Sequence, residues 1–172
     1  MEIERILLTQ EQIQTRIREL GAALSADYAD KTPIFIGVLR GAVHFYTDLT
    51  LQFPHPCQYD FIGAASYGGE TQTSGQVQLT KDVMTDLRGR HVIVVEDILD
   101  TGLTLRFVTD YLRSKQPASL KLCVLLDKPE RRRADIAADY VGFTIPNEFV
   151  VGFGLDYQEL YRNLPYIGIL KP

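Results

Sequence analysis

Apolar and polar positions form alternating blocks through the middle of the chain. Three segments rich in apolar residues, at 33–39, 91–98 and 119–127, have the length and composition of buried strands. The first two are followed by segments with apolar residues at helical spacing, one that we expect to begin at Gly41 and one at 103–115. Strands that alternate with helices in this way favour βαβ units and a parallel sheet.

The two ends of the chain carry different patterns. Near the N-terminus a helix is predicted, because Thr9 and Gln12 resemble a capping box and apolar residues recur at helical spacing over the following turns. The C-terminal quarter contains short strand-like segments, which we expect to form a smaller cap beside the main sheet, at 140–146, 149–154 and 165–170.

A polar segment separates two further candidate strands. Segments 59–67 and 76–83 predict a strand and a second strand or hairpin arm, and the Gly- and Thr-rich segment 68–75 between them predicts a mobile surface loop. An ordinary exposed hairpin loop is the alternative interpretation of this stretch.

Composition narrows the class of protein. The 172 residues suit one domain, and 45% apolar with 23% charged residues is typical of a soluble globular chain. A net charge of -4 argues against nonspecific nucleic-acid binding but allows a local basic pocket. No apolar run approaches the roughly 18 residues of a membrane span, and no signal pattern opens the chain. Cys57 and Cys123 lie far apart among apolar residues, so we expect two buried thiols and a cytoplasmic protein.

Candidate chemistry begins where the second strand gives way to a helix. Asp100, Thr101, Gly102, Leu103 and Thr104 lead into that helix. A helix N-terminus offers unpaired N–H groups and partial positive charge, the glycine lets several N–H groups face one anion, and the threonines add hydroxyl donors. The segment therefore predicts a phosphate cradle, although a Walker A loop is absent from the sequence. Plain helix capping is the alternative for Asp100 and Thr101.

Two acidic residues precede this cradle. Glu96 and Asp97 would emerge at the carboxyl end of the strand, where ligands of open α/β sheets bind. Carboxylates accept hydrogen bonds from sugar hydroxyls, so the acid pair and the cradle together predict a ribose 5-phosphate ligand. The alternative is that the two acids simply end a strand at the surface.

Residues 94–104 form an apolar run followed by these acids and the Asp-Thr-Gly-x-Thr turn. This string resembles the signature of the type I phosphoribosyltransferases. Segments 37–45, 66–78, 125–132 and 141–170 resemble the 6-oxopurine branch of that family, the hypoxanthine-guanine phosphoribosyltransferases. The resemblance implies an α/β fold: a parallel-sheet core with helices on both faces, and a small cap, or hood, built largely from the C-terminal segment. It implies one domain over 1–172.

The resemblance also assigns roles to residues. Phosphoribosyl pyrophosphate would be held by its ribose hydroxyls at Glu96 and Asp97 and by its 5-phosphate at 100–104. Asp100 would also handle the proton at purine N7. The pyrophosphate would lie against Leu39, Arg40, Gly41 and Arg162, with a cis peptide at Leu39–Arg40. Ser66 and Tyr67 would be the working residues of a lid that excludes water from the reaction.

The same resemblance predicts a purine site and a metal. Lys128 would donate to the purine 6-oxygen from a strand that continues through it, Phe149 would stack on the base, and the Val150 main chain would pair with its edge. Asp156 would belong to this region and, with Glu96 and Asp97, would hold Mg²⁺. Taken singly, each side chain has a plainer alternative: core packing for Phe149, a solvated position for Lys128, a surface arginine for Arg40 and a surface ion pair for Arg162. The arginines at 131–133 are predicted to form a solvated face.

These assignments predict an enzyme that uses phosphoribosyl pyrophosphate and a 6-oxopurine, without a nucleic-acid or membrane partner, and that forms a homodimer or homotetramer. A regulator that binds a phosphoribosylated ligand would be expected to carry a basic face or a DNA-binding domain, and the sequence offers neither. A transferase for another base, uracil or xanthine, is the third hypothesis. The C-terminal region argues against uracil, while the choice among hypoxanthine, guanine and xanthine stays open.

Overall fold

Two sheets and four helices make up the computed structural model, which describes residues 2–67 and 76–171. The helices are α1 (Gln10–Tyr28), α2 (Val43–Leu51), α3 (Leu103–Arg113) and the 3₁₀-helix η1 (Pro129–Arg131). The strands are β1 (Ile3–Leu8), β2 (Ile34–Leu39), β3 (Gln58–Tyr67), β4 (Gln76–Lys81), β5 (His91–Leu99), β6 (Ser119–Asp127), β7 (Tyr140–Thr144), β8 (Val150–Val151) and β9 (Ile167–Leu170).

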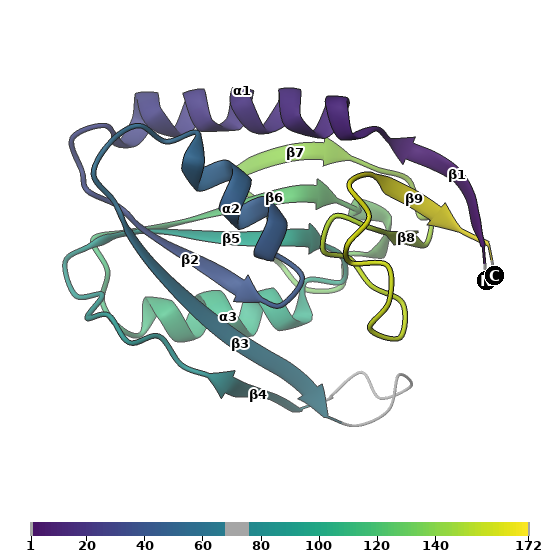
Figure 1. Cartoon of the computed structure of the whole chain (residues 1–172). Helices are drawn as coiled ribbons and strands as arrows, with labels where there is room; N and C mark the ends of the chain where they lie inside the picture. Colours follow the sequence, from purple (N-terminus) through teal and green to yellow (C-terminus); the bar gives the residue numbers. More distant parts are fainter. Residues whose placement is uncertain (1, 68–75, 172) are drawn as a thin grey trace.

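The larger sheet is mainly parallel, as predicted. Its six strands lie in the order β4-β3-β2-β5-β6-β7, and only β4 runs antiparallel to its neighbour. The strand order moves outward in both directions from the β2–β5 pair, which makes that pair the switch point of the sheet. Because parallel strands end on the same side, the residues that follow β2, β5 and β6 gather at one edge (Figure 1).

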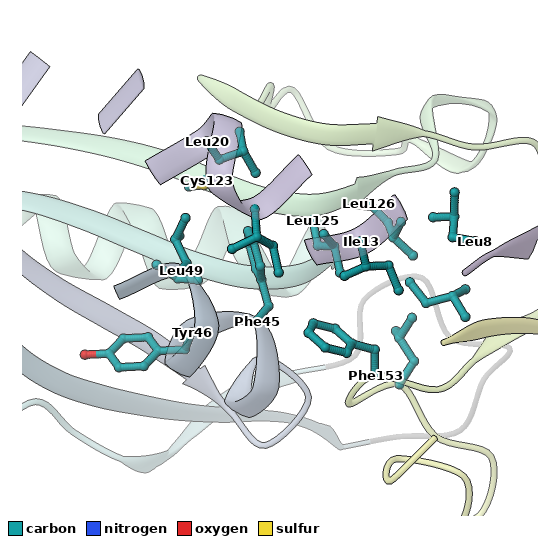
Figure 2. Packing of buried hydrophobic residues seen from close by; sticks show 14 of the residues in the cluster. Leu8, Ile13, Leu20, Phe45, Tyr46, Leu49, Cys123, Leu125, Leu126 and Phe153 are labelled. Atoms are coloured by element: carbon teal, nitrogen blue, oxygen red, sulfur yellow. The ribbon is translucent and has the colours of Figure 1, made fainter. Parts of the chain in front are cut away.

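Helices cover both faces of this sheet, so the predicted layers are confirmed. In β5, Ile93 and Val95 face the core formed with α1 and α2, whereas Val92 and Val94 face the core formed with α3. All four are fully buried, which explains why residues 92–95 of the strand are apolar at every position rather than at alternate ones. Figure 2 shows the first core, where Phe45 of α2 packs among side chains of α1 and β6.

Local signals fix the start of α1 but not the start of α2. Thr9 and Gln12 form the predicted capping box: the Gln12 N–H donates to Thr9 Oγ1 at 3.1 Å, and the Thr9 N–H donates to Gln12 Oε1 at 2.8 Å. The expectation that the next helix begins at Gly41 is wrong, since α2 begins at Val43. A Cβ at Gly41 would lie 2.1 Å from Asp97 Oδ2, so close approach to β5 is what requires this glycine.

A small second sheet, the hood, lies beyond the carboxyl ends of β5 and β6 (Figure 1). Its order is β1-β9-β8, so the prediction of a hood built largely from the C-terminal segment is confirmed for β8 and β9, with one strand added from the N-terminus. The expectation that segment 140–146 also belongs to this cap is wrong, because β7 pairs in parallel with β6 at the edge of the larger sheet. The sequence interpretation missed β1, because charged residues interrupt it and its partner lies at the other end of the chain. The Lys171 N–H donates to the Glu2 carbonyl at 2.9 Å, which ties the two ends together.

The expectations about membrane spans and about the two cysteines can be compared with the structure. No helix among residues 2–67 and 76–171 has both the length and the apolar character needed to cross a membrane. Both cysteines are free thiols, but only Cys123 is buried, and Cys57 is half-buried. The expectation of two buried thiols is therefore wrong for Cys57, which lies in the connection just before β3. Burial raises the pKa of both thiols.

Candidate active site

The carboxyl edge of the sheet brings three turns together. Residues 40 and 41 follow β2, residues 100–104 follow β5, and residues 128–134 follow β6. The first turn touches β5 through Gly41, which lies against the Asp97 carboxylate. The third turn is tied to β5 by the Lys128 N–H, which donates to the Leu99 carbonyl at 3.0 Å. Side chains far apart in the sequence therefore surround the end of β5.

The acid pair lies near the carboxyl end of β5, as predicted, and it is buried within the strand rather than ending the strand at the surface. β5 continues to Leu99 because β6 runs beside it, and Glu96 stands in register with Val124. Glu96 and Asp97 are 9% and 8% exposed. The Asp97 N–H donates to Glu96 Oε1 at 2.8 Å, and the Ile98 N–H donates to Asp97 Oδ1 at 2.7 Å.

Burial and crowding perturb this acid pair. Burial raises the pKa of Glu96 well above its ordinary value, and the charge of the neighbouring Asp97 raises it further. A pair of buried carboxylates that repel each other is suited to hydroxyl donors or to a cation.

The turn after β5 has the predicted cradle shape. Gly102 is the N-cap of α3 with φ +83°, a left-handed conformation that favours glycine. The first N–H groups of α3 have no partner within the helix and point toward the turn. A cavity of about 270 Å³ lies here. It is lined by Glu96, Asp97, Ile98, Asp100, Thr101, Gly102, Thr104 and Leu105.

The end of β3 also reaches this cradle. Ser66 Oγ lies 3.4 Å from Thr104 Oγ1, which brings one of the two predicted lid residues to the site. Tyr67 is the last residue of β3. The segment 68–75, predicted to be a mobile loop, lies outside the described residues.

Two cations flank the Asp100 carboxylate. Arg131 Nε lies 3.2 Å from Asp100 Oδ1, and Lys128 Nζ lies 4.0 Å from Asp100 Oδ2. The Arg131 contact is an ion pair without hydrogen-bond geometry, so the buried Oδ1 atom accepts no hydrogen bond from the described residues. A carboxylate held between cations, with acceptor capacity remaining, can exchange a proton with a bound ligand.

The turn after β6 is a brace for the cradle, not a solvated face. Arg132 is 19% exposed, pairs with Asp127, and donates from Nε to the Asp100 carbonyl at 3.1 Å. The Arg133 N–H donates to the Thr101 carbonyl at 2.8 Å. The prediction of a solvated arginine face is therefore wrong for Arg132, because this turn folds back over the β5–α3 connection, whereas Arg131 and Arg133 are exposed as predicted.

Lys128 is buried, so the solvated alternative for this residue is excluded. Its side chain is 7% exposed. The prediction that β6 continues through Lys128 is wrong: the strand ends at Asp127, and Lys128, with ψ 77°, caps η1 ahead of Pro129. Burial lowers the pKa of Lys128 below its ordinary value, and the Asp100 carboxylate offsets only part of that effect.

The turn after β2 meets a loop of the hood. The peptide bond between Leu39 and Arg40 is cis, as predicted. A Cβ at Gly154 would lie 2.0 Å from the Gly41 carbonyl oxygen, so the two backbones are in close contact. Arg162 donates from Nη1 to the Gly154 carbonyl at 2.6 Å. Arg40 is next to Gly41 in the chain, and Arg162 binds the Gly154 carbonyl, so the contact between Gly41 and Gly154 brings the two arginines into the same region.

The remaining candidates lie on the hood. Phe149 is 52% exposed, which excludes core packing, and its ring meets Tyr157 edge-on with centroids 5.7 Å apart. Val150 is buried and pairs with Ile169 in the hood sheet. Burial lowers the pKa of Lys128, and the charge of Glu148, which lies near the end of β6, offsets a small part of that effect.

The acidic residues fit a magnesium ion that is bound jointly with substrate. Within the part of the chain that the structure describes, no three His, Cys, Asp or Glu side chains are arranged to hold a metal ion by themselves. Mg²⁺ typically keeps several waters and shares one or two carboxylates with substrate phosphates. Glu96 and Asp97 offer two crowded carboxylates at the cradle, and Asp156 offers another on the hood loop.

The sequence interpretation missed two charged residues of the site. Arg131 is exposed as predicted, but its ion pair with Asp100 was not predicted, and Glu159 was not singled out although it pairs with Arg40. Its position three residues before Arg162, as in a helical ion pair, was the one available signal. The contact with Arg40 spans more than a hundred residues and leaves no local pattern.

Comparison with known protein families and sequences identifies one family. A family model described as phosphoribosyl transferase domain matches residues 6–158. The hypoxanthine-guanine phosphoribosyltransferase of Bacillus subtilis (strain 168) is 48% identical over 171 residues, which cover 99% of this chain and 95% of the relative. A Streptococcus thermophilus protein of the same name is 50% identical over 170 residues, covering 99% and 94%.

Solved structures agree with the sequence relatives. A hypoxanthine phosphoribosyltransferase from Staphylococcus aureus superposes with a TM-score of 0.96 at 48% identity, covering 99% of this chain and 93% of the other. A hypoxanthine-guanine phosphoribosyltransferase from Bacillus anthracis superposes with a TM-score of 0.95 at 46% identity, covering 99% and 100%.

Proposed function

The chain belongs to the phosphoribosyltransferase family, and from that premise we propose that it is a hypoxanthine-guanine phosphoribosyltransferase of purine salvage. It transfers ribose 5-phosphate from 5-phosphoribosyl 1-pyrophosphate to N9 of a 6-oxopurine. The observation that carries the proposal is the placement of Lys128 beside Asp100, because it joins a phosphate-binding turn to a buried donor for the base. Relatives of this name, about half identical over nearly the full chain, support it.

The ribose-phosphate part of the substrate occupies the cavity at the end of β5. The backbone N–H groups at 100–104 and the hydroxyls of Thr101 and Thr104 bind the 5-phosphate, helped by the N-terminal dipole of α3. Glu96 and Asp97 accept hydrogen bonds from the ribose 2- and 3-hydroxyls. The 270 Å³ cavity has room for this group, and its lining joins the acid pair to the cradle.

Pyrophosphate lies between the β2 turn and the hood loop. The backbone at Leu39 and Gly41 faces the anion, and Arg40 and Arg162 supply guanidinium donors. The contact between Gly154 and Gly41 supports this assignment, since it holds the two segments at a fixed spacing.

The purine lies between the cradle and the hood. Lys128 donates to the 6-oxygen, which favours a 6-oxo base over adenine because the adenine 6-amino group is itself a donor. Phe149 stacks on the ring, the Val150 main chain pairs with its edge, and Asp156 belongs to the same region. The exposed ring of Phe149 supports this role.

The residues of the site stabilise charge and move one proton. Bond breaking at C1 of the ribose builds an oxocarbenium-like centre, and the carboxylates around the cradle favour that positive charge. Asp100 handles the proton at purine N7, with Lys128 and Arg131 fixing its position. Glu96, Asp97 and Asp156, together with the substrate, would hold Mg²⁺, which would supply positive charge to the departing pyrophosphate. Ser66 and Tyr67 help to keep water from the reacting centre.

We further propose one domain over 1–172, acting in the cytoplasm as a homodimer or homotetramer without nucleic-acid or membrane partners. Val43 and Leu51 on α2 and Tyr59 on β3 are 40%, 72% and 51% exposed, and apolar exposure of this kind supports a subunit contact. Sedimentation of the purified protein tests it: a monomer at micromolar concentration contradicts the proposed assembly.

An assay with each base in turn tests the proposed activity. The protein is incubated with phosphoribosyl pyrophosphate and Mg²⁺ plus hypoxanthine, guanine, xanthine, adenine or uracil, and nucleotide and pyrophosphate are measured. Formation of IMP and GMP with little turnover of adenine and uracil is expected. Absence of any nucleotide from the 6-oxopurines contradicts the proposal.

A further inference from the structure

One carboxylate contacts both arginines that are assigned to pyrophosphate. Glu159 Oε2 lies 2.8 Å from Arg40 Nη2, and Glu159 Oε1 lies 3.3 Å from Arg162 Nη2. Arg40 comes from the end of β2, whereas the other two residues belong to the hood loop. A single side-chain anion therefore bridges the two segments between which pyrophosphate is assigned.

A carboxylate in this position offers the chemistry that pyrophosphate offers. Both anions accept paired hydrogen bonds from guanidinium groups, so the same donors suit either one. Arg162 Nε is buried and has no hydrogen-bond partner among the described residues, so the guanidinium keeps a donor that Glu159 does not satisfy. An anion with more acceptor oxygens than a carboxylate can satisfy it.

The loop that carries Glu159 has an unusual backbone. Gln158 and Glu159 have φ values of +51° and +67°, a left-handed region that non-glycine residues seldom adopt. The Glu159 N–H donates to Asp156 Oδ2 at 2.8 Å, which holds the carboxylate on the side of the arginines. The loop geometry thus aims this side chain, whose exposed fraction of 57% leaves it free to swing into solvent.

We propose that Glu159 is a positioning residue that occupies the pyrophosphate subsite of the ligand-free protein. Its carboxylate holds Arg40 and Arg162 in their binding geometry, competes with pyrophosphate for them, and moves out when pyrophosphate or phosphoribosyl pyrophosphate binds. This inference rests on the proposed function. It implies that Glu159 weakens pyrophosphate binding and speeds pyrophosphate release, without acting on the purine.

The experiment compares Glu159→Gln with the wild-type protein in a calorimetric titration with inorganic pyrophosphate in the presence of Mg²⁺. Loss of one or two competing exposed ion pairs should lower the pyrophosphate Kd roughly three- to tenfold. In the forward reaction the KM for phosphoribosyl pyrophosphate should fall in the same sense, while the KM for hypoxanthine stays unchanged. A merely structural loop residue would not tighten one ligand and leave the other alone.

A matched control is Glu19→Gln. Glu19 is 58% exposed and pairs with Arg16 at 3.2 Å on α1, away from the site, so its removal costs a similar ion pair and should leave the pyrophosphate Kd unchanged. Glu159→Asn serves as a second variant, because asparagine tolerates the left-handed backbone at this position. It should also tighten pyrophosphate binding.

Unchanged or weaker pyrophosphate binding in both Glu159 variants overturns the inference. Weaker binding would mean that the carboxylate orders the arginines without competing for them. Failure of the proposed function is a separate result: wild-type protein that binds pyrophosphate but forms no nucleotide from any base contradicts the transferase activity and leaves the titration of the variants interpretable.

Discussion

Lys128→Met should impair purine use while leaving the fold intact or slightly more stable. The lysine is buried just after β6, and among the described residues its one ion pair is the 4.0 Å contact with Asp100. Methionine keeps the length and apolar stem of the side chain but removes the charged donor. Asp100 keeps its contact with Arg131 at 3.2 Å, so the variant does not strand a buried carboxylate.

The expected loss of activity follows from the proposed hydrogen bond between Lys128 and the purine 6-oxygen. A hydrogen bond from a charged group contributes about 1.5–3 kcal/mol, which corresponds to a fall of about 10- to 150-fold in kcat/KM for hypoxanthine. The KM for phosphoribosyl pyrophosphate should change little. The steady-state rate of nucleotide formation, measured by absorbance at varied hypoxanthine, gives both constants.

The stability of the ligand-free variant follows from the pKa of Lys128. Because burial lowers this pKa in the folded state, the folded protein binds the lysine proton less readily than the unfolded chain does. The charged lysine therefore costs stability at neutral pH, and the cost disappears as pH rises through the ordinary lysine pKa. Urea unfolding should show Lys128→Met at least as stable as wild type at pH 7, with the difference shrinking at high pH.

The control for this prediction is Lys121→Met. Lys121 is 49% exposed and pairs with Asp139 at 3.9 Å, so its replacement should leave activity and stability nearly unchanged. If Lys128→Met keeps the wild-type KM and preference for hypoxanthine, the purine assignment is wrong. If it unfolds at a clearly lower urea concentration, the ion pair with Asp100 stabilises the fold and the electrostatic reasoning is refuted.

Three further changes test other parts of the account. Asp100→Asn should lower kcat by about 10²- to 10⁴-fold with phosphoribosyl pyrophosphate binding retained, as kinetics and titration would show, and equal turnover contradicts the proton-transfer role. Gly41→Ala should abolish tight phosphoribosyl pyrophosphate binding, because the alanine Cβ would lie 2.1 Å from the Asp97 carboxylate. The matched control is Gly89→Ala, where the added Cβ meets nothing within 4 Å. The control should keep full activity and lose about 1 kcal/mol of stability, because alanine is strained at the Gly89 φ of +71°. Asp60→Asn should destabilise the fold by about 1–3 kcal/mol at pH 7 in urea unfolding, and the loss should vanish at low pH.

The pKa of Asp60 determines the pH range in which this residue stabilises the fold. Burial alone would raise this pKa, but backbone hydrogen bonds from Phe61, Thr85 and Met84 outweigh burial and lower it. A carboxyl group with a lowered folded pKa contributes stability that is present above its unfolded pKa and is lost as pH falls through the folded pKa. A variant with wild-type stability at pH 7 contradicts this account.

Local patterns were sufficient to predict the strand and the turn at the centre of the candidate site. β5 is apolar on both faces because both faces are covered, and the turn from Asp100 to Thr104 carries its own signals: an acid, a glycine with positive φ and two hydroxyls ahead of a helix. The family resemblance then correctly predicted the cis peptide at Leu39–Arg40. These features depend on residues that are close together in the chain.

Features that depend on distant parts of the chain were missed or misjudged. β1 exists because it pairs with β9, and an interrupted pattern of apolar residues does not reveal a partner more than 150 residues away. The end of β6 depends on β5 beside it, so proline alone could not locate it. The pairing of Arg131 with Asp100 and of Glu159 with Arg40 depends on the same kind of contact, which no spacing rule encodes.

The proposed function is tested most directly by one measurement on the purified protein. Phosphoribosyl pyrophosphate, Mg²⁺ and hypoxanthine are mixed with the enzyme, and IMP and pyrophosphate are quantified over time by chromatography. The account predicts that IMP and pyrophosphate appear in equal amounts and that Asp100→Asn forms them far more slowly. Hypoxanthine that remains unconverted by the wild-type protein would contradict it.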